Sequence, residues 1–157
     1  AGDLPLPPRR VDPATITVSA SSELAADHDA GLTYAARNTI DGDLATAWND
    51  GVGGVGVGET LTYTFAQPVR LVRVDAVNGY AKSPRRYVEN ARVRRATLST
   101  DATSFPVTFA DRYRLWQSFS LDAAPTSSLT VEIESVYAGS TYRDVALTEF
   151  AFWAQQA

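Results

Sequence analysis

The chain has 157 residues, of which 45% are hydrophobic and 20% charged, as expected for one folded domain rather than a disordered segment. Its formal net charge of -4 at pH 7 argues against nucleic-acid binding, which requires a basic surface to neutralise phosphates. Without cysteine there is no disulfide and no thiolate metal site, and no stretch approaches the roughly 20 apolar residues that insert directly into a bilayer.

The first 13 residues are expected to form an extended linker, because prolines interrupt them before any hydrophobic alternation begins. They also lack the apolar core of a signal peptide. We therefore expect residues 1–13 to tether a single domain, residues 14–157, to another part of a larger protein.

Alternation of apolar and polar residues dominates the rest of the chain. In residues 60–65, Leu61, Tyr63 and Phe65 share one face and threonines the other, a period of two that is typical of a strand. The same period recurs in residues 16–18, 72–76, 105–109, 115–121, 129–133 and 144–153. With about eight short strands and no amphipathic helix of about ten residues, the predicted fold is all-β, an antiparallel two-sheet β-sandwich of the jelly-roll type.

The last of these strands is apolar on both faces, which predicts a central or covered position. Trp153 in this strand and Trp48 are both expected in the core. Glu149 interrupts the apolar run, and a carboxylate there is costly unless a cation or hydrogen-bond donors meet it. We therefore expect Glu149 to have a partner.

Residues 38–48, NTIDGDLATAW, place several oxygen donors in one irregular loop, called here the ion loop. The carboxylates of Asp41 and Asp43 and the hydroxyl of Thr46 suit calcium, which takes roughly six to eight oxygens, many of them backbone carbonyls. The alternative is purely structural: Asp41 and Gly42 form a turn, Asp43 caps it, and Glu149 pairs with an arginine.

The ion loop resembles the pattern of the discoidin, or coagulation-factor type C, family, which runs Asn-Ala-x-Asp-Gly and then Thr-x-Trp, with a C-terminal glutamate returning to the same site. Thr39 replaces the common alanine and leaves the carbonyl donors in place. The resemblance implies a galactose-binding-like sandwich with one structural calcium ion that pins the loop to the last strand. The implied ligands are the side chains of Asp41, Thr46 and Glu149 and the backbone carbonyls of Asn38, Asp43, Thr46 and Thr148.

The resemblance extends over residues 16–153. Residues 56–82 and 86–95 look most similar to a bacterial subgroup named NADase-type glycan-binding domains, although neither glycohydrolase activity nor a defined glycan follows from that name. The chain is also similar to the extracytoplasmic end of actinobacterial membrane proteins involved in cell-wall assembly. These resemblances imply an extracytoplasmic, non-catalytic module of a larger bacterial protein.

A basic and aromatic segment follows the strand at residues 72–76. Its tyrosines could stack on sugar rings, while its arginines and asparagines could bind hydroxyls, carboxylates or phosphates. The candidate ligand-binding residues are Asn78, Tyr80, Lys82, Arg85, Arg86, Tyr87, Asn90, Arg92 and Arg94, with Tyr142 and Arg143 from the loop before the last strand. In the alternative, the arginines line the solvent face of a strand and the tyrosines pack under the loop.

No catalytic residue is predicted. The single histidine, His28, has no nucleophile motif around it, and a multi-histidine zinc site is excluded. Residues 51–56, GVGGVG, match the G-x-G-x-x-G dinucleotide pattern but lead into a strand rather than a helix, so a mobile glycine loop is favoured.

These observations favour a binding module over an enzyme acting on a sugar or nucleotide. The leading hypothesis is recognition of a cell-envelope glycan, peptidoglycan or another acidic wall polymer. The alternative is a protein–protein interaction module that docks a membrane-protein partner involved in cell-wall assembly.

Overall fold

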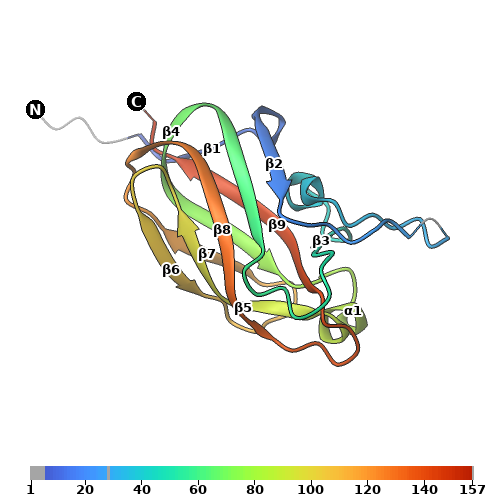
Figure 1. Ribbon diagram of the computed structural model, residues 1–157. Helices are drawn as coiled ribbons and strands as arrows, with labels where there is room; N and C mark the ends of the chain where they lie inside the picture. The colour runs from blue at the N-terminus through green and yellow to red at the C-terminus, as the bar shows by residue number, and fades with distance from the viewer. Residues whose placement is uncertain (1–5, 28, 157) are drawn as a thin grey trace, which may run out of the picture.

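The computed structural model describes residues 6–27 and 29–156 and confirms the predicted all-β sandwich (Figure 1). Within these residues there are nine strands, one short α-helix and two 3₁₀ turns. The elements are β1 (Arg9–Arg10), η1 (Pro13–Thr15), β2 (Ile16–Ala20), η2 (Ala36–Ile40), β3 (Trp48–Asn49), β4 (Thr60–Asn78), α1 (Pro84–Glu89), β5 (Ala91–Ser99), β6 (Ser104–Thr108), β7 (Trp116–Ser120), β8 (Pro125–Tyr137) and β9 (Val145–Ala154).

Strand β4 belongs to both layers of the sandwich. Its first part, from Thr60 to Thr64, pairs antiparallel with β2 and β8, and the part from Leu71 onward pairs with β9 and β7. Between Thr64 and Val69 the register with β8 shifts, and Figure 1 shows β4 bending sharply from one layer into the other. Strands β5 and β6 extend the β8 side, while β1 and β3 pair with β9.

The core between the layers is rich in aromatic rings. Tyr63 and Phe65 of β4 contact Phe152 of β9, with ring centroids 4.8 and 5.6 Å away. Trp48 is fully buried, as predicted, and its indole Nε1 donates to the Ser22 carbonyl at 2.8 Å. Each buried aromatic side chain stabilises the fold by roughly 1.5–3 kcal/mol.

Trp153 lies on the outer face of β9, so its predicted place in the core is wrong. Side chains alternate along a strand, and Phe152 takes the inward position. The indole Nε1 of Trp153 donates to Asp75 Oδ2 at 3.1 Å, and the Arg73 guanidinium lies 4.6 Å from the ring centre. Glu149 has the same parity as Trp153 and therefore also points away from the core, but the ion loop covers it and leaves it 1% exposed.

The segment before residue 14 takes part in the sheet where it is described. Arg9 and Arg10 pair with the end of β9, and the Val11 amide donates to the Phe152 carbonyl at 2.8 Å. Asp12 then caps the turn η1. Residues 1–5 of the predicted linker, and His28, lie outside the described residues, and the boundary at residue 14 stays a prediction.

Ser83 and Pro84 start helix α1. The Ser83 hydroxyl accepts a hydrogen bond from the Arg86 amide at 3.2 Å, and proline is suited to the first turn of a helix. It ends at Asn90, whose backbone is extended. Among the described residues, no helix has the length and apolar character needed to cross a membrane.

Candidate functional site

The ion loop and Glu149 meet in the structure, as the resemblance to the discoidin family implied. Gly42, which has a φ of 75°, donates its amide to Glu149 Oε2 at 3.1 Å. The other oxygen, Oε1, is buried without a hydrogen-bond partner among the described residues. Burial raises the pKa of Glu149 to about 8, and the nearby Asp41 carboxylate adds to this shift. Arg10 is close enough to oppose the shift but forms no ion pair with Glu149 within the described chain.

The remaining oxygens of the ion loop are arranged by local hydrogen bonds. Asp41 accepts from the Asp43 amide at 2.9 Å and from the Thr46 hydroxyl, and Asp43 Oδ1 accepts from Ala45 at 2.8 Å. The amide of Asn38 donates to the Ala47 carbonyl at 3.0 Å. These bonds curl the loop so that the carboxylate of Asp41 lies beside Glu149.

The donor set fits a calcium ion, although coordination by these residues stays a prediction. The Thr148 hydroxyl donates to the Gly79 carbonyl at 2.6 Å and accepts from the Ala81 amide at 2.9 Å, which leaves only its backbone carbonyl for a cation. In residues 6–27 and 29–156, no cluster of three or more histidine, cysteine, aspartate or glutamate side chains is placed to hold a metal. A cation here would depend on two carboxylates, a hydroxyl and backbone carbonyls, and the unpartnered Glu149 Oε1 is the observation that fits it.

A cavity of about 630 Å³ opens beside α1. Its walls come from the segment between β2 and η2, from β3, from α1 with the loop before it, and from the loop before β9. The lining residues are Leu24, Asp27, Ala30, Leu32, Tyr34, Asn49, Tyr80, Ser83, Arg85, Arg86, Glu89, Asn90, Tyr142 and Asp144. We call this cavity the pocket.

Arg86 and two tyrosines form the aromatic side of the pocket. The rings of Tyr34 and Tyr80 meet edge to face, with centroids 6.3 Å apart, and the Arg86 guanidinium lies 5.5 Å from the Tyr80 ring centre. Burial raises the pKa of both tyrosines, and the Arg86 charge opposes this. No carboxylate of the described residues forms an ion pair with Arg86.

Asparagines and carboxylates form the polar side. Asn49 Nδ2 donates to Asp144 Oδ2 and to Asn90 Oδ1, the latter at 3.3 Å, and Asn90 Nδ2 donates to the Arg86 carbonyl at 2.9 Å. Two buried polar atoms of lining residues, Asn49 Oδ1 and Tyr80 Oη, have no hydrogen-bond partner in the described chain. Both atoms lie beneath the pocket wall rather than on its surface, since Asn49 and Tyr80 are 1% and 2% exposed.

Five of the predicted ligand-binding residues line the pocket: Tyr80, Arg85, Arg86, Asn90 and Tyr142. Lys82 is half-buried outside the lining, and Arg94 and Arg143 are exposed elsewhere. Sequence reasoning missed Tyr34, Asn49 and Asp144. Tyr34 carried a usable signal, because it closes a long polar segment between two predicted elements, where sandwich domains place binding loops.

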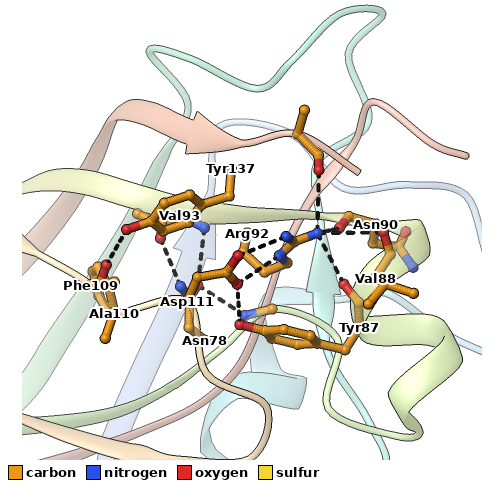
Figure 2. Close-up of polar contacts among 12 residues, drawn as sticks. Asn78, Tyr87, Val88, Asn90, Arg92, Val93, Phe109, Ala110, Asp111 and Tyr137 are labelled. Atoms are coloured by element: carbon orange, nitrogen blue, oxygen red, sulfur yellow. Dashed lines mark hydrogen bonds and ion pairs between the residues drawn. The ribbon is translucent and has the colours of Figure 1, made fainter. Parts of the chain in front are cut away.

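Arg92, Tyr87 and Asn78 lie in the interior, which corrects their assignment to a ligand surface (Figure 2). Tyr80 borders the pocket but is only 2% exposed, so both tyrosines pack under the loop, as in the alternative interpretation of the sequence. Arg92 donates to both oxygens of Asp111, at 3.1 and 2.9 Å, and to the carbonyls of Asn90 and Ala138, at 3.0 and 3.3 Å. This network ties the end of α1 to neighbouring loops, as Figure 2 shows.

The other two buried residues serve the same framework. The Tyr87 hydroxyl donates to Asp111 Oδ1 at 2.5 Å. Asn78 uses both ends of its amide on the backbone: its Nδ2 donates to the Val93 carbonyl at 2.7 Å, and its Oδ1 accepts from the Val93 and Gly79 amides. Their polar atoms therefore position the loops around the pocket.

The glycine-rich segment of residues 51–56, extended here to residue 58 and called the glycine loop, leads into β4 rather than a helix, as the sequence indicated. Gly56 has a φ of 75° and approaches Asp50, whose side chain is fully buried. Asp50 Oδ1 accepts from the Val145 amide at 2.6 Å, but Oδ2 has no partner among the described residues. Burial raises the pKa of Asp50 to about 6.

Comparison with solved structures finds the same fold in carbohydrate-binding modules. A family 32 module from Clostridium perfringens, solved with GalNAc-β-1,3-galactose, matches with a TM-score of 0.72 and 14% identity over 93% of this chain and all (100%) of that one. The family 32 module of AlyQ, solved with 4,5-unsaturated mannuronic acid, matches with a TM-score of 0.62 and 18% identity over 87% and 92% of the two chains. Part of the mycobacterial arabinofuranosyltransferase AftD also matches, with a TM-score of 0.70 and 18% identity, over 90% of this chain and 11% of that one.

No curated protein matches the chain. Residues 11–153, however, match the family described as NAD glycohydrolase translocation F5/8 type C domain. That match spans nearly the whole sandwich, from the residue after β1 to the last residue but one of β9. The chain therefore belongs to the NAD glycohydrolase translocation F5/8 type C domain family, a discoidin-like family.

Proposed function

We propose that this domain is a non-catalytic binding module at the bacterial cell surface, attached to a larger protein, and that it holds a glycan in the pocket. The observation that carries the proposal is the Arg86 guanidinium, which lies over the Tyr80 ring without an ion-pair partner in the described chain. Tyr80 is only 2% exposed and lies beneath Arg86, so the ring available for stacking on the apolar face of a sugar is the half-buried Tyr34, while the Arg86 guanidinium donates to sugar oxygens.

We infer that the ligand is peptidoglycan or another acidic wall polymer. A sugar carboxylate could accept two parallel hydrogen bonds from Arg86, the strongest contact that a guanidinium makes. The similar module of AlyQ was solved with an unsaturated mannuronic acid, which is such a sugar acid. Asp27 and Asp144 also line the pocket and would repel a second carboxylate, so one acidic group is accommodated, at Arg86.

Sedimentation with purified cell walls tests the proposal. Arg86→Ala and Tyr34→Ala should reduce the bound fraction at least tenfold, because they remove the cation and one ring of the pocket. Arg95→Ala is the matched control, since Arg95 is exposed on β5 outside the pocket. Equal retention of the wild type and both pocket variants would reject the pocket as the glycan site.

We also propose that calcium binds between the ion loop and Glu149 and has a structural role. Asp41 and Glu149 would neutralise the ion, and the Thr46 hydroxyl with the carbonyls of Asn38, Asp43, Thr46 and Thr148 would complete its oxygen shell. Isothermal titration of chelator-stripped protein with calcium should give one site, and Asp41→Ala should abolish it. Equal calcium binding by wild type and Asp41→Ala would refute this site.

A protein partner in cell-wall assembly is the second candidate function. It is favoured by Val52, Val55 and Val57 of the glycine loop, whose side chains are 44%, 45% and 52% exposed. A photocrosslinker placed at Val55 in cells should capture one membrane protein if this surface docks a partner. Recovery of glycan alone, or of no product, would reject the protein-docking candidate.

A further inference from the structure

We infer that residues 113–116 form a second sugar-contacting surface next to the pocket, so that the domain binds a run of a glycan chain rather than one terminal sugar. We call the exposed rings of Tyr113 and Trp116, together with the aliphatic Leu115 between them, the aromatic platform. The inference rests on the proposed binding of a glycan by the pocket, because the chain that leaves the pocket is the occupant assigned to the platform.

The first observation is exposure. Tyr113, Leu115 and Trp116 are 37%, 46% and 44% exposed, whereas Trp48 is fully buried. Trp116 begins β7, where it pairs with Val77 of β4, so its backbone is fixed in the sheet while its side chain faces solvent. Large apolar side chains gathered in one exposed segment mark interaction sites more often than isolated ones do.

The second observation is that this segment is held rigidly. Arg114 has a φ of 55°, a left-handed conformation that costs a non-glycine residue roughly 1–2 kcal/mol. Its Nε donates to the Ala81 carbonyl at 2.7 Å, and its guanidinium lies 5.6 Å from the Tyr113 ring centre. The edge of the Tyr113 ring meets Tyr87, with centroids 5.7 Å apart. Exposed rings that are already ordered lose little entropy on binding, and strained residues cluster at ligand sites.

The third observation is continuity with the pocket. Arg114 also donates to the Lys82 carbonyl at 3.4 Å, and the next residue along the chain, Ser83, lines the pocket. Tyr87, which the platform contacts, lies on α1, the same short helix that supplies Arg86 to the pocket. These contacts hold Arg114 and Tyr113 against the segment that borders the pocket, and Trp116 pairs with Val77, which lies three residues before Tyr80 of the pocket lining. A polymer that leaves the pocket across Lys82 and Ser83 would reach this end of the platform.

Two probes of different length separate the two sites: intact purified peptidoglycan sacculi and disaccharide fragments released from them. Trp116→Ala should bind sacculi about tenfold more weakly and bind the fragments like wild type, since one stacked ring contributes about that much. Trp116→Phe keeps an aromatic ring and should retain most of the affinity. Leu6→Ala, which removes another exposed apolar side chain far along the chain from the platform, should bind both probes normally.

The possible failures are distinct. If Trp116→Ala binds both probes like wild type, the aromatic platform is not a glycan surface. If Trp116→Ala weakens binding of sacculi and fragments equally at unchanged melting temperature, there is no second site beyond the pocket, and the inference is wrong. If Arg86→Ala binds both probes like wild type, it is the proposed function of the pocket that fails.

Discussion

Replacing Glu149 with glutamine should have opposite effects with and without calcium. Glu149 is 1% exposed, and its carboxyl has one donor, the Gly42 amide. Its pKa is raised from 4.5 to about 8 by burial and by Asp41. Because the pKa is raised, the stability that the protonated Glu149 contributes is fully present at pH below about 4 and is lost as the pH rises through the pKa of the folded state. At pH 7 the stability lost is set by how far the pH lies above the ordinary pKa of 4.5. At about 1.4 kcal/mol per pH unit, this loss is at most roughly 3 kcal/mol.

Without calcium, Glu149→Gln should therefore be more stable than wild type at pH 7, by at most about 3 kcal/mol. Glutamine keeps an acceptor for Gly42 and can donate its amide to Asp41, so no buried atom loses a partner. With millimolar calcium the order should reverse, because only the wild type gains binding energy. Urea unfolding followed by circular dichroism, in chelator and in calcium, measures both effects, with the exposed Glu132→Gln as control. Equal stabilisation of wild type and Glu149→Gln by calcium would refute the reasoning.

Three further predictions concern the framework. Arg92→Leu should lower the free energy of unfolding by about 3 kcal/mol, because it leaves Asp111 and several backbone carbonyls unpaired. Urea unfolding measures the effect, and a denaturation midpoint equal to that of the wild type would contradict it. Arg92 also lowers the pKa of Asp111, so the wild type should lose this stabilisation as the pH falls below about 4, whereas the Leu variant should show a smaller acid loss. Burial raises the pKa of Asp50 from 3.8 to about 6, so the ionised carboxylate destabilises the folded state at high pH. Asp50→Asn should therefore raise the free energy of unfolding at pH 8 by at most about 3 kcal/mol and change it little at pH 4. A gain in stability that is independent of pH would argue against this explanation. Gly56→Ala should lower the free energy of unfolding by about 2 kcal/mol, because φ is 75° and an added Cβ would lie 2.5 Å from the Val145 side chain. Gly53→Ala is the control and should cost little, since an added Cβ there would meet no atom within 4 Å. Thermal unfolding compares the two variants, and equal melting temperatures would refute the strain argument.

The sequence was sufficient to predict the sandwich because its strands carry a clear period of two. The residues also predicted that Glu149 would need a partner, since a single carboxylate in an apolar strand stands out against its neighbours, but its meeting with the ion loop was implied only by the resemblance to the discoidin family. Trp153 shows where this reasoning stops: the strand is apolar on both faces, and parity alone did not say which face pointed inward. Phe150 and Phe152 occupy the core, and that places Trp153 outside.

The pocket could be predicted only in part. Arg86 and Tyr80 were found because charge and aromatic residues are concentrated in their segment of the sequence. Arg92 was misplaced because its partner, Asp111, is 19 residues away and no local pattern joins the two. Asn49 was missed because it reaches the pocket through β3, a strand of only two residues that has no periodicity to read.

The continuity of β4 has a mechanical consequence. Because one strand supplies hydrogen bonds to both layers, sliding one layer over the other would require breaking the ladder on at least one side of the bend. The loop that leaves β4 after Asn78 runs directly into the wall of the pocket, so a force applied at that wall would pass along this strand into both layers together. The domain is thus suited to hold a load as one unit instead of shearing apart.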